Sequence, residues 1–85
     1  GQGSISSLIT FAATKGAAEL NLSPDDVVTA VLMLQPRDFY KSMESEKIPG
    51  LWQDVYHLNH HRCWLYIKLQ LLADGRAVVV QFKEK

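Results

Sequence analysis

The chain has 85 residues, enough for one small domain with a single sheet and a few helices, but too few for a second core. Nine cationic residues balance nine acidic ones, which excludes a strongly basic protein that holds nucleic acid mainly through bulk charge. No stretch approaches the roughly 18 apolar residues of a membrane span, and the single cysteine cannot form an intramolecular disulfide, so we expect a soluble, cytoplasmic protein.

The N-terminal part is expected to be helical. Residues 1–4 have no periodicity and are interpreted as a flexible lead-in or a remnant of cloning, which leaves residues 5–85 as one domain with a helical part at 5–35 and a sheet at 38–85. Apolar residues at helical spacing predict a short helix over residues 4–13. Residues 14–20 are either its continuation or a second helix, with an uncertain boundary near Lys15 and Gly16.

A second helix is predicted over residues 24–34. Ser23 is a suitable N-cap, Pro24 suits the first helical position, and two acidic residues in the first turn complement the helix dipole. Pro36 follows as a stop signal. The predicted buried face consists of Val27, Val28, Val31, Leu32 and Leu34.

After Pro36 the apolar period changes to two, and β-branched and aromatic residues become frequent, which is typical of strands. Strands are predicted at residues 38–43, 51–58, 62–72 and 76–83, with loops at 48–50 and 59–61. Helices followed by strands predict an α+β fold, in which N-terminal helices pack on a twisted, mostly antiparallel four-stranded sheet.

The pair Asp74-Gly75 between two apolar-alternating segments predicts a two-residue type I′ hairpin turn. In this register Ala73 faces Arg76, Lys68 faces Gln81 and Tyr66 faces Lys83. Directly opposed side chains lie about 5 Å apart on one face of a sheet.

Alternation along the third predicted strand separates two faces. Its apolar face is expected in the core, together with Val78, Val80 and Phe82 of the fourth strand; the third-strand residues are Cys63, Leu65, Ile67, Leu69 and Leu71. The other face carries Trp64, Tyr66, Lys68 and Gln70, and their expected partners are Val79, Gln81 and Lys83. Cations and rings on one surface suit phosphates and bases, although an ordinary solvated sheet face has the same pattern.

Four segments together resemble the MqsR family of toxin endoribonucleases: DFYKSM at 38–43, WQDVY at 52–56, YIK at 66–68 and FKEK at 82–85. The first half of the chain shows only general similarity to the family's helical region. The resemblance implies a RelE-like fold whose exposed sheet face cleaves mRNA without a metal or other cofactor. It also implies inhibition of growth and a cognate antitoxin as partner.

Carried over position by position, the resemblance places the catalytic group at Lys41, Gln53, Tyr66 and Lys83. Tyr66 would act as general base or orient the 2′-hydroxyl, since a facing Lys83 would lower the phenol's ordinary pKa of about 10. Lys41 would bind the scissile phosphate or protonate the leaving oxygen, and Gln53 would hold phosphate or a base edge. Each can instead be a packing or solvated residue.

Further RNA contacts are expected from Lys68, Trp64, Gln81 and His57 on the same face. Two acids that follow Lys41, Glu44 and Glu46, disfavour a phosphate site, so that RNA binding can depend on the ribosome.

The spacing H-x-x-H-H-x-C, formed by His57, His60, His61 and Cys63, invites a zinc interpretation. It is not the spacing of a standard structural site, Cys63 is expected in the core, and an exposed loop with two histidines explains it better. His57 is an alternative general base on the face of Gln53.

A second hypothesis is a catalytically silent protein-interaction module of the same fold. Catalysis requires Tyr66 and Lys83 to be exposed on one face and in contact, whereas a binding module has no need of this arrangement.

Overall fold

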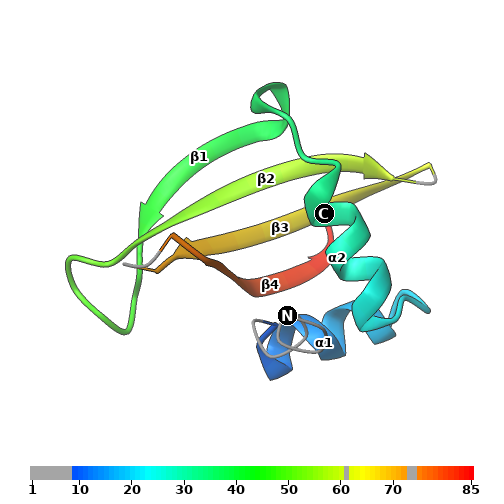
Figure 1. Cartoon of the computed structure of the whole chain (residues 1–85), viewed down its shortest axis with the longest axis horizontal. Coiled ribbons are helices and arrows are strands. Elements are labelled where there is room, and N and C mark those ends of the chain that lie inside the picture. The colour runs from blue at the N-terminus through cyan, green and yellow to red at the C-terminus, as the bar shows by residue number, and fades with distance from the viewer. Residues whose placement is uncertain (1–8, 61, 73–74) are drawn as a thin grey trace.

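The computed structural model describes residues 9–60, 62–72 and 75–85. Helices α1 (Phe11–Ala18) and α2 (Pro24–Leu32) and the 3-10 helix η2 (Pro36–Asp38) precede four strands, β1 (Phe39–Glu44), β2 (Trp52–His60), β3 (Cys63–Leu71) and β4 (Ala77–Glu84). The strands form one antiparallel sheet in the order β1-β2-β3-β4, with the helices on one side (Figure 1). The predicted α+β class is confirmed, and the strand bounds differ from prediction by two residues at most.

The start of α1 differs from the sequence prediction. Ile9 forms a parallel bridge to Val79 of β4, and the Thr10 side chain caps the helix by accepting a hydrogen bond from the Ala13 amide. The described part of the predicted helix over residues 4–13 is therefore helical only from Phe11. The expected lead-in at residues 1–4 lies outside the described residues.

Helix α1 runs without a break past Lys15 and Gly16 and packs on β4 through small residues. Ala13 and Ala17 are fully buried, and Gly16 lies directly against the backbone carbonyl of Phe82. Small side chains at this spacing allow the helix backbone to approach the strand closely.

Helix α2 begins as predicted, with Ser23 as N-cap and Pro24 in its first turn. Asp26 completes a capping box, in which its carboxylate accepts from the Ser23 amide at 2.8 Å. The helix ends at Leu32 instead of residue 34, and its buried residues are Val27 and Ala30. The prediction that Leu32 is buried is wrong, since its side chain is 80% exposed.

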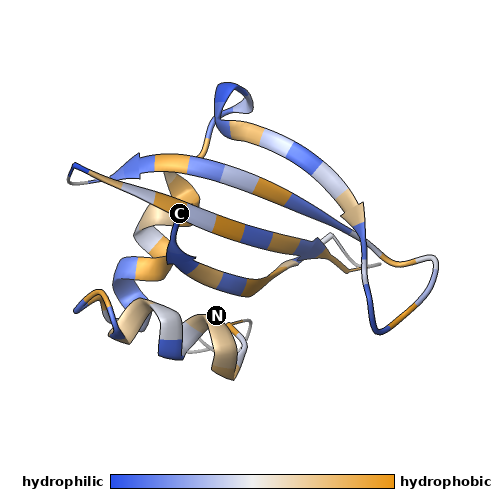
Figure 2. Ribbon diagram, turned by 180° about the vertical axis from the view of Figure 1, so that it is seen from behind, coloured by the Kyte–Doolittle hydropathy of each residue, from blue (hydrophilic) through white to orange (hydrophobic). Residues whose placement is uncertain are grey.

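The sheet buries the face that we call the core face against the two helices. Its buried residues are Leu58, Leu65, Ile67, Val79 and Phe82. Alternating hydropathy along the strands is visible in Figure 2. The helices cover only one end of this face (Figure 1), so Leu71, at the far end of β3, is 64% exposed, contrary to the prediction that it is buried.

The predicted hairpin register holds for Tyr66 with Lys83 and for Lys68 with Gln81, but not near the turn. There the Leu72 amide donates to the Arg76 carbonyl, so residues 73–75 connect the strands in place of the predicted two. Ala73 and Asp74 themselves lie outside the described residues.

A β-bulge at Val80 restores the register, because β3 steps from Lys68 to Leu69 while β4 skips from Gln81 to Val79. The bulge reverses two expected orientations: Val79 is in the core, and Val78 lies opposite Gln70 on the other face. Thr10 stabilises the bulge by donating hydrogen bonds to the carbonyls of Val79 and Val80.

The predicted polar loop at residues 59–61 is largely strand. The β2–β3 ladder continues through Asn59 opposite Trp64 to His60 opposite Cys63. His61 lies outside the described residues. Within the described part of the chain, no helix has the length and apolar character required to cross a membrane.

Candidate functional site

The sheet face opposite the helices, here called the outer face, carries the residues that the sequence analysis selected. The pairing register arranges its side chains in rows across the four strands. His57, Tyr66 and Lys83 form one row, which we call the Tyr66 row; Lys41, Val55, Lys68 and Gln81 form the Lys68 row; Met43, Gln53, Gln70 and Val78 form the Gln53 row.

Tyr66 and Lys83 are in contact, as the register requires. The Lys83 ammonium lies over the ring of Tyr66, 5.0 Å from its centroid, and Lys83 is exposed while Tyr66 is half-buried. On the other side of Tyr66, the His57 ring lies 6.0 Å away. A tyrosine, an imidazole and an ammonium group are thus adjacent on a surface that solvent reaches.

Tyr40 extends this row, although its place was not foreseen. Its ring stacks on His57 with centroids 4.2 Å apart and planes at 21°. Simple alternation would put Tyr40 and Lys41 on opposite faces. A β-bulge between Phe39 and Lys41 turns Tyr40 to the outer face as well. The sequence holds no signal for this bulge.

Lys41 and Lys68 lie in the neighbouring row, on either side of Val55. The Lys41 ammonium is 5.4 Å from the centroid of the Tyr40 ring, which places it close to the Tyr66 row. The acid that follows it, Glu44, pairs with Trp52 on the opposite face and accepts a hydrogen bond from the Gly50 amide at 2.6 Å. The sequence had suggested that Glu44 opposes phosphate binding at Lys41. Its position on the opposite face removes this objection.

Gln53 is separated from Tyr66. It precedes His57 by four positions on β2, which corresponds to about 13 Å along a strand. Its side chain is only 8% exposed, and Nε2 donates to Oε1 of Gln70 at 3.3 Å. This geometry suits a residue that holds neighbouring side chains of the outer face in position. It does not suit contact with the phosphate group that Tyr66 would contact.

The pKa of His57 is lowered below its ordinary value of 6.5, first by desolvation and then by the positive charges of Lys85 and Lys41. The imidazole is therefore neutral at pH 7, and it can accept a proton. Lys85 also lies over the ring of Trp64, 5.8 Å from its centroid, and its amide donates to the Trp64 carbonyl. Trp64 and Lys85 thus extend the outer face beyond the Tyr66 row.

The histidine and cysteine segment does not assemble a metal site in the part of the chain that the structure describes, where no three His, Cys, Asp or Glu residues cluster suitably. Cys63 packs against the core, half-buried, and its Sγ is 3.6 Å from a carboxylate oxygen of Glu84. Burial raises the pKa of the Cys63 thiol most, and the negative charge of Glu84 raises it further. Both effects disfavour the reactive thiolate.

Comparison with known proteins gives a consistent result. Residues 3–84 match the family described as "motility quorum-sensing regulator, toxin of MqsA". The chain is also 36% identical over 76 residues to the mRNA interferase toxin MqsR of Escherichia coli (strain K12), a match that covers 89% of this chain and 76% of that protein. With nearly the whole chain matched, the resemblance in its strand segments is confirmed: the chain belongs to the MqsR toxin family.

Proposed function

We propose that this protein is an endoribonuclease toxin that cleaves mRNA without a metal ion and thereby inhibits growth. The name of the E. coli relative, an mRNA interferase toxin, supports the activity and the substrate class. The observation that carries the assignment of a reaction site is the Lys83 ammonium over the Tyr66 ring, with His57 on the other side, on the face that the helices leave open.

RNA supplies its own nucleophile, so the protein must position groups and move protons. The 2′-oxygen attacks the adjacent phosphorus, and the bond from phosphorus to the 5′-oxygen breaks. One protein group accepts the proton of the 2′-hydroxyl, and another donates a proton to the leaving 5′-oxygen. Proton transfer and charge stabilisation of this kind contribute about two to four orders of magnitude each.

In this proposal Tyr66 reacts as the phenolate, whose negative charge the Lys83 ammonium stabilises. The phenolate oxygen orients the 2′-hydroxyl and accepts its proton as the 2′-oxygen attacks phosphorus, which leaves Tyr66 as the phenol. His57 is a second group able to accept that proton, because its lowered pKa keeps it neutral. Lys41, next to Tyr40, binds the scissile phosphate or protonates the leaving oxygen.

The rest of the outer face binds the RNA strand on either side of the reaction site. Lys68 and Gln81 contact the phosphate backbone, and Trp64 offers a half-exposed ring on which a base can stack. Gln53 acts as a positioning residue, since its amide group is buried and bonded to Gln70.

The family description, which names its members as toxins of MqsA, supports an antitoxin protein as partner of this chain. An antitoxin and mRNA as partners fit a cytoplasmic location. The balanced charge of the chain limits its affinity for free RNA, and we therefore include the ribosome among its proposed partners.

The activity is tested with the purified chain, an mRNA transcript and excess chelator, with and without ribosomes. We expect cleavage products that end in a 2′,3′-cyclic phosphate and a 5′-hydroxyl, because the 2′-oxygen is the nucleophile. A 2′-deoxy substitution at the cleaved nucleotide should abolish the cut. Absence of cleavage under all these conditions would support the catalytically silent interaction module instead.

The role of Tyr66 is tested by Tyr66→Phe, which keeps the ring and removes the hydroxyl. We expect the fold to persist and cleavage to fall by about 100-fold or more, together with loss of growth inhibition. Tyr56→Phe is the matched control, because Tyr56 packs against the core. If Tyr66→Phe retains cleavage within about threefold of the parent chain, Tyr66 loses its role and His57 becomes the proton acceptor to test.

A further inference from the structure

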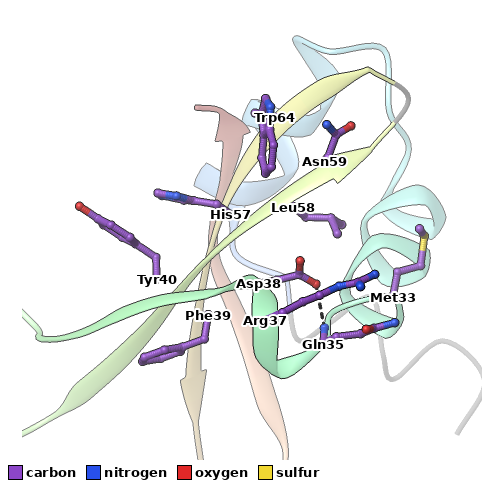
Figure 3. Close-up of a pocket in the computed structure, with 10 residues that line it drawn as sticks. All are labelled: Met33, Gln35, Arg37, Asp38, Phe39, Tyr40, His57, Leu58, Asn59 and Trp64. Carbon is purple, nitrogen blue, oxygen red and sulfur yellow. Dashed lines mark hydrogen bonds between the residues drawn. The ribbon is translucent and has the colours of Figure 1, made fainter.

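A pocket of about 530 Å³ adjoins the Tyr66 row, at the place where β2 runs beyond the end of β1. Among the described pairs, β1 reaches only to Tyr56, whereas β2 continues to His60. The last part of β2 therefore has no partner from β1 along this edge, and its residues His57, Leu58 and Asn59 line the pocket. Figure 3 shows the side chains that line it.

One wall of the pocket is aromatic. Tyr40 is 56% exposed and lies stacked on His57, and Trp64 of β3 stands farther along the same face. The bulge in β1 is what directs Tyr40 to this wall. Rings arranged in this way offer a stacking surface for a planar ligand.

Other residues of the lining are polar. Figure 3 shows Arg37 and Asp38 across the β2 ribbon from His57, with Asn59 near the top of the pocket. Asp38 accepts a hydrogen bond from the Gln35 amide at 2.9 Å, which fixes the turn that carries Arg37. A guanidinium group, a carboxylate and an amide together supply both the donors and the acceptors that the edge of a base requires.

The chemistry of the pocket favours a base over a phosphate group. A carboxylate next to the single cation of the lining opposes an anion, whereas a neutral heterocycle uses both groups. The ring wall adds an interaction that a phosphate cannot make.

We propose that this pocket binds one unpaired nucleobase of the RNA, that of a nucleotide beside the scissile phosphate, and so sets the sequence preference of cleavage. The inference rests on the proposed ribonuclease function. Its location follows from the register, because His57, which lines the pocket, lies directly opposite Tyr66. Tyr40 supplies the stacking surface, and Arg37 and Asn59 read the edge of the base.

The test is a double-mutant cycle between protein and RNA. A short oligoribonucleotide with one mapped cleavage site is prepared with an abasic residue at each position around that site in turn, and kcat/KM is measured for the parent chain and for Tyr40→Leu. At one flanking position the abasic change should lower kcat/KM for the parent chain by roughly 10-fold or more. Tyr40→Leu should lose a similar factor on the intact RNA and nothing further on that abasic RNA.

Sequence preference is measured on a substrate pool randomised around the cut. Asn59→Ala and Arg37→Ala should flatten the base preference at the same flanking position by roughly 10-fold, while Tyr66→Phe lowers cleavage at all sequences alike. Independent, multiplicative losses for Tyr40→Leu and every abasic position, or an unchanged preference in the Asn59 and Arg37 variants, would overturn the proposal.

Binding distinguishes failure of the pocket from failure of the catalytic proposal. An oligonucleotide that carries 2-aminopurine at the flanking position and a 2′-O-methyl group at the cleaved nucleotide reports stacking through fluorescence quenching, without turnover. We expect quenching by the parent chain, by Tyr66→Phe and by the control Trp52→Leu, whose ring is 59% exposed on the opposite face, and loss of quenching with Tyr40→Leu. Where the parent chain cleaves no RNA, the 2-aminopurine is scanned along the oligonucleotide, and absence of Tyr40-dependent quenching at every position rejects the pocket as a base site.

Discussion

At the scale of single residues, the contact between Lys83 and the Tyr66 ring predicts that the two side chains act as one unit. Tyr66→Phe and Lys83→Ala should each lower cleavage strongly, and the double variant should lose less than the product of the two losses. The measurement is kcat/KM for the four proteins on one RNA. Purely multiplicative losses would show that the two residues act independently.

His57 makes folding stability depend on pH. Its pKa in the folded chain lies below 6.5, so the unfolded chain binds more protons, and stability increases with pH. The stability that the folded chain gains by keeping His57 neutral is fully present above about pH 6.5. It decreases as the pH falls toward the lowered pKa of His57 in the folded chain. Thermal unfolding followed by circular dichroism should show a lower midpoint at about pH 5 than at about pH 7.5.

The variant His57→Phe isolates this effect, because it keeps an aromatic ring against Tyr40 but cannot be protonated. The decrease in midpoint between the two pH values should be smaller in this variant than in the parent chain. An equally steep decrease would assign the pH dependence to groups other than His57.

At the scale of elements, the packing of α1 on β4 depends on one glycine. A β-carbon at position 16 would overlap the carbonyl oxygen of Phe82, which is fixed backbone. Gly16→Ala should therefore destabilise the fold by about 1–3 kcal/mol or more, although alanine is the better helix former by about 1 kcal/mol. The free energy of unfolding in urea measures the difference.

Ala12→Ser is the matched control on the exposed side of the same helix, since it adds one heavy atom where nothing is displaced. It should change stability by less than about 0.5 kcal/mol. Equal stabilities for Gly16→Ala and the parent chain would mean that α1 shifts away from β4 without cost.

At the scale of the whole molecule, charge is balanced overall but cations gather on the outer face. RNA binding should weaken with added salt, by a slope of about 0.7 in log K per phosphate contact on single strands. Lys68→Gln and Lys41→Gln should each reduce this slope by about 0.7 if each holds one phosphate. Anisotropy titrations with a non-cleavable oligonucleotide at several salt concentrations measure it.

Lys47→Gln is the control for this series, because Lys47 lies in the connection between β1 and β2, away from the rows. It should leave the slope unchanged. Association that does not respond to salt, in any of the variants, would indicate that the outer face does not bind RNA through phosphates.

The sequence by itself determined the order of the elements, the start of α2 and the two faces of β3, because each depends on neighbouring residues: a cap, a turn signal and a period of two. It also placed Tyr66 opposite Lys83, but this was correct only because two register shifts cancel. The extra residue between β3 and β4 shifts the register by one position, and the bulge at Val80 shifts it back. The candidate pair could thus be predicted although the predicted register next to the turn was wrong.

Only the tertiary structure decided which side chains join that pair. The bulge in β1 turns Tyr40 to the outer face, and the bulge in β4 turns Val79 to the core. The bulge in β4 is held by a hydrogen bond from the Thr10 hydroxyl to the carbonyl of Val80, seventy positions later in the sequence. Gln53 lies between Met43 and Gln70 on the neighbouring strands, where it is buried, and Leu71 is exposed because the helices cover only the other end of the core face. Contacts between distant segments fix these features, and no local period or propensity records them.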